Sequence, residues 1–265
     1  MLSTAIRALV RVAMAAAVLF VALSEGRRAG LVASATLLAV LFILVIWLPR
    51  AAHRAFRGGD YNRARLLYKV LRLWVLRQRA RDAVDVSLAA CALAREDWTA
   101  ALAQLDRMEP ERLGPTARAA WLNNRAYALA RSGEDHHGAL SYAEQAIALR
   151  PDVAGFRHTR GLALLGVGRT DEAIAELDRL WSQLADQSDD VTALEAERCY
   201  DLARAWSDKG EKEYATDYYQ RVLRAMVAHP DAPALSLPVL GDAALHQLAA
   251  WNDTTAATTD DHAVA

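Results

Sequence analysis

Five stretches of the sequence share one spacing of small residues, and this repetition restricts the possible folds more than any other feature. A small residue is followed seven positions later by a turn position, which is glycine in four of the five stretches, and five or six positions later by alanine. The five sets are Ala52, Gly59 and Ala64; Ala89, Glu96 and Ala101; Ala126, Gly133 and Ala139; Gly161, Gly168 and Ala173; and Ala203, Gly210 and Ala215. The closing alanines are 37, 38, 34 and 42 residues apart, a period that indicates a helical repeat array.

The spacing has a direct physical interpretation as a helical hairpin. Small residues allow two antiparallel helices to approach closely, and glycine can end the first helix in a left-handed conformation. Large residues lie four positions after the alanine in four stretches, on the same face of the second helix; they are Tyr68, Leu105, Leu177 and Tyr219. One hairpin cannot bury its apolar face alone, so we predict an all-α solenoid of about five helix pairs that share a continuous core.

The pattern resembles the tetratricopeptide repeat (TPR) family, through these small-residue, Gly and Ala positions and the closing prolines Pro151 and Pro230. The resemblance covers roughly residues 50 to 230. It implies a TPR solenoid of antiparallel helix pairs whose concave groove binds a protein or peptide. We predict three regions: a transmembrane helical hairpin over 1–48, the TPR-like solenoid with a C-terminal capping helix over 49–251, and a disordered tail over 252–265. The capping helix has Leu245, Leu248 and Trp251 on one side, which we expect to cover the end of the array.

The N-terminal region contains two apolar segments. Between Arg28 and Arg50 lie 21 uncharged residues, enough to cross the hydrocarbon core of a bilayer as a helix. Residues 12–24 form a shorter apolar segment, which spans if Arg7 and Arg11 snorkel to the interface. The alternative is a cleavable signal peptide. A kink is expected near Pro49, where the second span continues into the first repeat.

Charge is distributed unevenly along the chain and predicts its orientation. Residues 50–81 hold ten Arg or Lys against Asp60 alone, whereas residues 82–265 hold 17 basic and 30 acidic side chains. Basic residues favour the cytoplasmic side, so we expect a multi-pass protein of a bacterial inner membrane with a cytoplasmic TPR body. Arg50, Arg54 and Arg57 are expected to contact the anionic membrane surface. The architecture is similar to that of HemY-type bacterial membrane proteins.

Several classes of function are disfavoured by the sequence. It contains no nucleophile elbow, no phosphate-binding loop and no His-Glu-x-x-His motif, so we expect no enzyme activity. No cofactor or metal is expected: Cys91 and Cys199 are far apart, and the adjacent His136 and His137 cannot share one helix face. The acidic body disfavours nucleic acid as a partner, and no small-molecule substrate is evident.

The TPR resemblance implies a groove lined by the first helix of each pair. The family's groove positions fall on six polar or bulky residues, which are Asn123, Tyr127, His158, Leu162, Tyr200 and Arg204. Asn124 matches the central asparagine of the carboxylate clamp that some members use. Val86, Ala90, Gly155 and Thr159 stand where that clamp needs Lys, Asn and basic residues, which disfavours binding of an acidic chain end.

These observations lead to two hypotheses about function. The first is a non-catalytic, membrane-anchored scaffold or adaptor that binds a protein or peptide partner in its concave groove. The second is a structural or regulatory subunit of a membrane enzyme complex that contacts its partners through the transmembrane hairpin. Small residues in both apolar segments, such as Ala13–Ala17 and Ala33–Ala35, permit the close helix packing that the second hypothesis requires.

Overall fold

The structure is a computed structural model that describes residues 27–75, 77–184, 191–228 and 240–251, together with the single positions 16, 20 and 24. The described elements are helical: α2 (Arg27–Phe42), the π-helical turn η1 (Ile43–Trp47), α3 (Leu48–Arg57), α4 (Tyr61–Trp74), α5 (Gln78–Leu93), α6 (Trp98–Leu105), the 3₁₀ turn η2 (Pro110–Arg112), α7 (Pro115–Ser132), α8 (His136–Leu149), α9 (Ala154–Gly166), α10 (Thr170–Leu184), α11 (Val191–Asp208) and α12 (Lys212–Ala228). A further helix covers 240–251.

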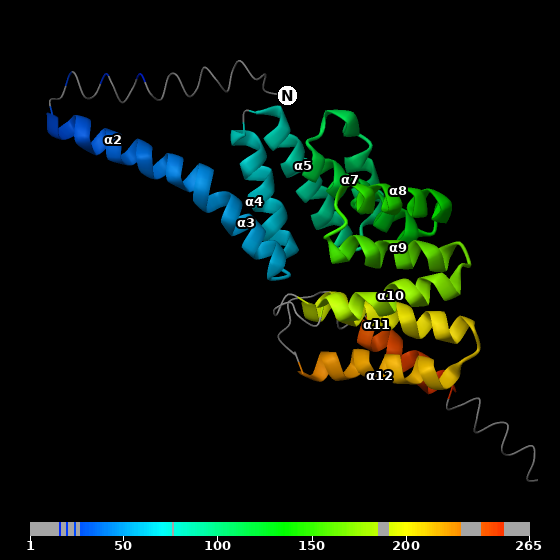
Figure 1. Cartoon of the computed structure of the whole chain (residues 1–265). Helices are drawn as coiled ribbons and strands as arrows, with labels where there is room; N and C mark the ends of the chain where they lie inside the picture. The colour runs from blue at the N-terminus through cyan, green and yellow to red at the C-terminus, as the bar shows by residue number, and fades with distance from the viewer. Residues whose placement is uncertain are drawn as a thin grey trace, which may run out of the picture.

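Five consecutive helix pairs form an all-α, TPR-like repeat array, as the sequence predicted. The pairs are α3 with α4, α5 with α6, α7 with α8, α9 with α10, and α11 with α12, and we number them units 1 to 5. The stack curves from α3–α5 through α7–α9 to α10–α12, while α2 extends away from it as a long rod (Figure 1). Each unit packs against the next one, so the core runs through the whole array.

The repeated small residues lie where the helices cross. All nine alanines of the pattern have 0% exposed surface. A Cβ added to Gly161 would lie 2.8 Å from the side chain of Leu177, so α9 and α10 approach too closely for a larger residue. Leu177 itself is 0% exposed. The predicted close packing within each pair is therefore confirmed.

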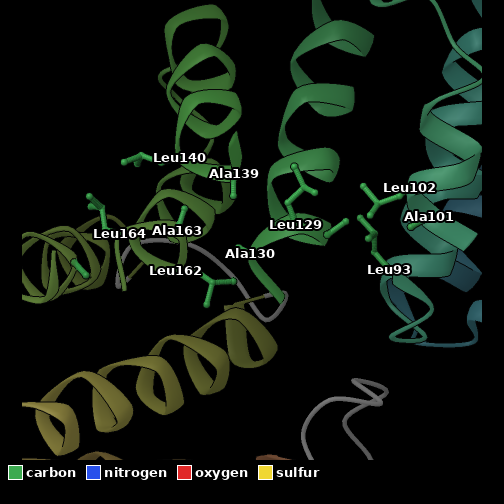
Figure 2. Packing of buried hydrophobic residues seen from close by; sticks show 12 residues of the cluster. Leu93, Ala101, Leu102, Leu129, Ala130, Ala139, Leu140, Leu162, Ala163 and Leu164 are labelled. Atoms are coloured by element: carbon green, nitrogen blue, oxygen red, sulfur yellow. The ribbon is translucent and has the colours of Figure 1, made fainter. Parts of the chain in front are cut away.

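The cores of neighbouring units merge through leucines. Figure 2 shows Leu93 and Leu102 of unit 2 facing Leu129 of unit 3, and Leu164 of unit 4 beside Leu140. Burial of one such leucine stabilises the fold by about 1.5 to 3 kcal/mol. The hydrophobic pattern of each helix thus holds two units together at once.

The turn between the two helices of each unit uses a left-handed residue. The predicted glycines Gly59, Gly133, Gly168 and Gly210 have φ between 72° and 79°. The corresponding residue of unit 2 is Glu96, with φ of 57°, a conformation that costs a non-glycine residue about 1 kcal/mol. Unit 2 therefore keeps the backbone geometry of the other units without their glycine.

Replacing Glu96 with glycine is expected to raise the free energy of unfolding by about 0.5 to 1 kcal/mol, because the left-handed conformation is then relaxed. The measurement is urea unfolding followed by circular dichroism. Gly133→Ala is the matched control, and it should lower stability by a similar amount. Equal stability of Glu96→Gly and the native chain would show that the left-handed conformation of Glu96 does not destabilise the fold.

The second helix of three units begins at an aspartate cap. The carboxylates of Asp60, Asp97 and Asp135 accept hydrogen bonds from the backbone N–H groups of Arg63, Ala100 and Gly138, at 3.0, 3.1 and 2.8 Å. Such caps satisfy backbone donors that the helix cannot pair internally. The cap at Asp135 places His136 at the start of α8, after one extra turn residue.

The apolar helix leads directly into the repeat array. Residues Leu31–Arg57 form one helix that is long and apolar enough to cross a membrane. The irregularity expected near Pro49 is a π-helical turn, in which the N–H of Leu48 donates to the carbonyl of Ile43. Proline has no N–H to continue the α-helical pattern. One membrane-length helix is thus found among the described residues, and the predicted first span over 12–24 lies outside them, apart from the single positions.

The final helix covers the end of unit 5 with a face that differs from the predicted one. Ala244 is fully buried, and Leu240, Leu248 and Trp251 pack against the same core. Leu245, predicted to belong to this face, is 49% exposed. The inward face follows positions 240, 244, 248 and 251, the spacing of one helical stripe. The predicted tail over 252–265 lies outside the described residues.

Candidate functional site: a pocket on the concave face

A hollow of about 330 Å³ lies inside the curve of the array. Its walls come from α3, α4, α5, α6, α7, α11 and the 240–251 helix, which belong to units 1, 2, 3 and 5 and the end of the array. The lining residues are Phe56, Tyr61, Ala90, Leu93, Ala94, Glu96, Trp98, Asn123, Asn124, Tyr127, Arg131, Glu197 and Leu240. The array is therefore curled enough for its first and fifth units to border one cavity, which we call the concave pocket.

Aromatic side chains form two edge-to-face pairs in the walls of the concave pocket. Phe56 and Tyr61 have ring centroids 5.4 Å apart, on either side of the first turn. Trp98 of unit 2 and Tyr127 of unit 3 are 6.0 Å apart. Pairs of this kind hold aromatic rings in fixed orientations. The pocket thus has a rigid, largely aromatic lining that spans three units.

A buried ion pair joins unit 3 to unit 5 beside the concave pocket. The guanidinium of Arg131 on α7 donates two hydrogen bonds to the carboxylate of Asp201 on α11, each of 3.1 Å. The Asp201 side chain is fully buried, and that of Arg131 is 15% exposed. His158 on α9 of unit 4 also contacts this carboxylate, with its Nε2 3.1 Å from Asp201 Oδ2. A two-pronged, buried contact of this kind fixes the relative orientation of its two helices.

Glu197 extends this network into the concave pocket. Tyr127 donates a hydrogen bond of 3.2 Å to Glu197 Oε2, and the same oxygen lies 3.8 Å from the Arg131 guanidinium. Burial and the negative charge of Glu197 raise the pKa of Tyr127 and of Tyr61. Both phenols therefore stay protonated at neutral pH, and Glu197 is a negative charge close to two aromatic rings.

The charge of Asp201 predicts a dependence of stability on pH. Burial alone would raise the pKa of this carboxyl, but Arg131, His158 and Arg204 together lower it from 3.8 to about 2. A lowered folded-state pKa stabilises the fold above the unfolded value, and this contribution is lost as pH falls from about 4 to about 2. We expect the native chain to lose about 2 kcal/mol over this range beyond what Asp201→Asn loses. Urea unfolding at pH values from about 5 down to about 2 measures the difference. Parallel plots of stability against pH for the two proteins would contradict the lowered pKa of Asp201.

Two of the six predicted groove residues line the concave pocket. Asn123 and Tyr127 do so, as the TPR resemblance implied. His158 and Leu162 of unit 4 instead lie in the interior, with 2% and 4% of their surface exposed. The reason is that Arg131 reaches Asp201 past α9, and the network covers the face of unit 4 that would otherwise border the groove. His158 and Leu162 therefore do not line the concave pocket.

The predicted groove residues of unit 5 also lie away from the concave pocket. Tyr200 packs edge to face against Tyr219, with centroids 5.9 Å apart, and Arg204 is exposed without lining the cavity. Glu197 faces the pocket in their place. The inward stripe of α11 is thus shifted by about one turn from the family positions, because the curl brings an earlier part of α11 against α7.

The site residues predicted from the sequence do not include Glu96, Arg131, Glu197 or Asp201. Two signals could have found them. Glu96 replaces glycine at a position that needs a left-handed residue, and Arg131 lies one helical turn after Tyr127 on the same face. Nothing in the sequence pairs α7 with α11, since Arg131 and Asp201 are 70 residues apart.

The basic residues predicted to contact the membrane surface occupy a second, shallow depression. Arg50, Arg54, Arg57 and His53 line it at the junction of the apolar helix and unit 1. All four side chains are exposed. In the described part of the chain, no group of three or more His, Cys, Asp or Glu side chains is arranged to hold a metal ion.

Comparisons with known proteins support the repeat assignment. A tetratricopeptide repeat family model matches residues 130–198. The array also resembles a thermophilic TPR protein of Thermus thermophilus, with 23% identity and a TM-score of 0.52 over 74% of this chain and 96% of that one. TPR-like repeats of a Podospora anserina putative kinesin light chain share 19% identity, with a TM-score of 0.46 over 69% of this chain and 94% of that one. A comparison with curated proteins found no match.

These matches define the class of the fold. The described array is an all-α helical repeat array of TPR type, and residues 130–198 carry the tetratricopeptide repeat pattern itself. Stacked repeats of this kind present extended concave surfaces on which partners can bind. The partner and the relation of this chain to a membrane are treated as proposals below.

Proposed function

We propose that the chain is a non-catalytic scaffold, anchored in a bacterial inner membrane, that binds a protein or peptide partner in its concave pocket. In this proposal residues 1–48 are a two-span hairpin of the HemY-like arrangement, residues 49–251 form the cytoplasmic array, and residues 252–265 are a tail. The observation that carries the proposal is the continuity of the apolar helix with the first repeat.

This continuity follows from where the side chains of one helix lie. Leu31, Leu38 and Val45 expose 66% to 71% of their surface. Such exposure of apolar side chains is unfavourable in water but not in lipid. Farther along, Leu48 and Ala52 are buried in the core of unit 1, at 4% and 0% exposure. A bilayer that holds the first part of the helix therefore also holds the array.

The shallow depression lined by Arg50, His53, Arg54 and Arg57 supports a location of unit 1 at the lipid surface. Arg50, Arg54 and Arg57 follow the apolar helix directly and are exposed. Each basic residue near an anionic membrane contributes about 1 kcal/mol of attraction, within a Debye length of the surface. In this proposal these arginines contact headgroups, and the concave pocket opens close to the membrane.

Cysteine labelling tests the membrane proposal, because the native thiols provide a low background. Cys91 and Cys199 are 0% and 3% exposed, and burial raises their pKa to about 11 and about 12. Thiolate is the reactive form, so we expect the native chain to react with maleimide at least about 100-fold more slowly than an exposed thiol near neutral pH. Fast labelling before denaturation would contradict this expectation.

Single cysteines then report the position of each segment. In cell-derived vesicles, Leu38→Cys should be protected from a membrane-impermeant maleimide until detergent is added. Ser141→Cys, on the exposed side of α8, should label only where the cytoplasmic face is accessible. Labelling of Leu38→Cys in intact vesicles would overturn the anchor, and labelling of Ser141→Cys from the opposite side would overturn the orientation.

A photo-crosslinker tests the concave pocket as the binding surface. A benzophenone amino acid at Ala94, in the pocket wall, should form a discrete adduct with a partner in cells, whereas one at Ser141 should not. Adducts at Ser141 but not at Ala94 would reject the pocket. Adducts at Leu38 alone would favour the alternative hypothesis, a subunit that contacts its partners through the membrane segment.

A further inference from the structure

The concave pocket combines aromatic walls with an excess of negative charge. Among the described residues, its three charged lining members are Glu96, Arg131 and Glu197. Arg131 donates two hydrogen bonds to the buried carboxylate of Asp201, just behind the wall. The same guanidinium lies 3.8 Å from Glu197, so one positive charge faces three carboxylates, those of Glu96, Glu197 and Asp201, and the negative charge is in excess.

The two glutamates and the aromatic rings line the same cavity. Glu96 is exposed at the turn before α6, two residues before Trp98, the first residue of that helix. Glu197 reaches in from α11 and accepts a hydrogen bond from the phenol of Tyr127, whose ring already lies 5.4 Å from the Arg131 guanidinium. A cation that enters the pocket thus meets carboxylates from units 2 and 5 and aromatic side chains from units 1 and 2.

Asn123 contributes a hydrogen-bond acceptor that has no donor partner among the described residues. This acceptor, Oδ1, is buried, although the side chain borders the pocket. Buried acceptors are normally paired. An N–H donor from a bound group would satisfy this oxygen after a small rotation of the amide, whereas an acidic or purely apolar group would not.

We propose that the concave pocket binds a lysine or arginine side chain in an exposed segment of the partner protein. Aromatic faces and carboxylates in a partly desolvated site attract ammonium and guanidinium groups by cation–π and Coulombic interactions. This inference rests on the proposed function, and it specifies the chemistry of the partner. It also fits the acidic body, since residues 82–265 hold 17 basic and 30 acidic side chains.

Other occupants are disfavoured by the same charges. The segment 252–265 holds three Asp and no Lys or Arg, so the carboxylates of the pocket repel it. An anionic lipid headgroup is repelled in the same way. An acidic chain end would need a free cationic group, and the arginine that lines the pocket is already paired with Asp201.

The test uses the full-length chain in nanodiscs of phosphatidylcholine, which carries no net charge. The probes are fluorescein-labelled nonapeptide pools with neutral flanking residues and one central residue, which is Arg, Lys, citrulline, norleucine or Glu. We expect the Arg and Lys pools to bind at least about ten times more tightly than the citrulline and norleucine pools by fluorescence anisotropy. The Glu pool should bind most weakly. Equal binding of the five pools, tighter binding of the Glu pool, or no binding of any pool would overturn the inference.

Variants assign the preference to the pocket. Glu96→Gln and Glu197→Gln should each weaken binding of the Arg pool several-fold and leave the citrulline pool unchanged. The matched controls Glu111→Gln and Glu213→Gln remove exposed carboxylates outside the pocket and should bind as the native chain does. Unchanged binding by both pocket variants would overturn the assignment.

Glu96→Gly separates function from folding. It should bind the Arg pool as weakly as Glu96→Gln does while being more stable than the native chain, because it also removes the left-handed strain. A variant that loses binding through misfolding cannot give this combination. If the crosslinker at Ala94 captures a partner but the pools show no preference for basic residues, the charge inference fails and the scaffold proposal stands. If Ala94 captures nothing, the scaffold proposal itself fails.

Discussion

Asp201→Ala is expected to lower the free energy of unfolding by about 3 to 5 kcal/mol, because it breaks a buried ion pair by removing one partner. The substitution removes both acceptors of the Arg131 guanidinium, whose side chain is 15% exposed and whose two bonds to Asp201 are each 3.1 Å long. The guanidinium then keeps only the more distant carboxylate of Glu197, 3.8 Å away, as a charge partner in this mostly buried position. Chemical denaturation monitored by circular dichroism measures the loss.

The control for Asp201→Ala is Asp106→Ala. Asp106 also pairs with an arginine, Arg125, but its side chain is 58% exposed. Exposed ion pairs contribute about 0 to 1 kcal/mol, so this variant should be nearly as stable as the native chain. A double variant, Arg131→Met with Asp201→Leu, should recover much of the stability that Asp201→Ala loses. A loss below about 1 kcal/mol for Asp201→Ala would show that the ion pair does not join the units.

Leu177→Ala is expected to cost about 2 to 5 kcal/mol, because it leaves a cavity where α10 packs on α9. Leu177 is 0% exposed and fills the space opposite Gly161. Gly161→Ala should also destabilise, since the new methyl group meets the same leucine at 2.8 Å. Denaturant unfolding of the native chain and both single variants gives the two losses.

The double variant, Gly161→Ala with Leu177→Ala, tests whether the two positions are in direct contact or whether the two substitutions destabilise the fold independently. The added methyl group occupies part of the space that the leucine leaves, so the combined loss should be at least about 0.5 kcal/mol smaller than the sum. Leu66→Ala is the exposed control, because Leu66 is 61% exposed. Strictly additive losses would contradict the direct contact between the two positions.

The repeat architecture could be predicted from the sequence because it depends on local spacing. The distance from Ala126 to Gly133, for example, fixes both a helix crossing and the end of α7, and both features depend on residues within one unit. The same spacing located the turn of unit 2 even though Glu96 stands there. Hydrophobic length alone indicated the helix that ends in the first repeat.

The pocket could be predicted less well, because it depends on how far the array curls. The family positions identified Asn123 and Tyr127, which belong to a unit with the regular geometry. They failed for His158 and Leu162, which the contact between Arg131 and Asp201 covers. That contact joins residues in units that are not adjacent, and a repeat pattern holds no information about such pairs. The stripe of the last helix was misassigned at Leu245 for a related reason, since its partner surface is not repeated elsewhere.

The π-helical turn at Ile43–Trp47 has a consequence for the rotational setting of the array. One residue of an α-helix corresponds to about 100° of rotation about the axis. Deleting one residue from this turn, or inserting one before it, would therefore rotate the array, and the pocket with it, about the axis of the apolar helix. In the proposed anchored arrangement, the turn sets the direction in which the cavity faces relative to the bilayer.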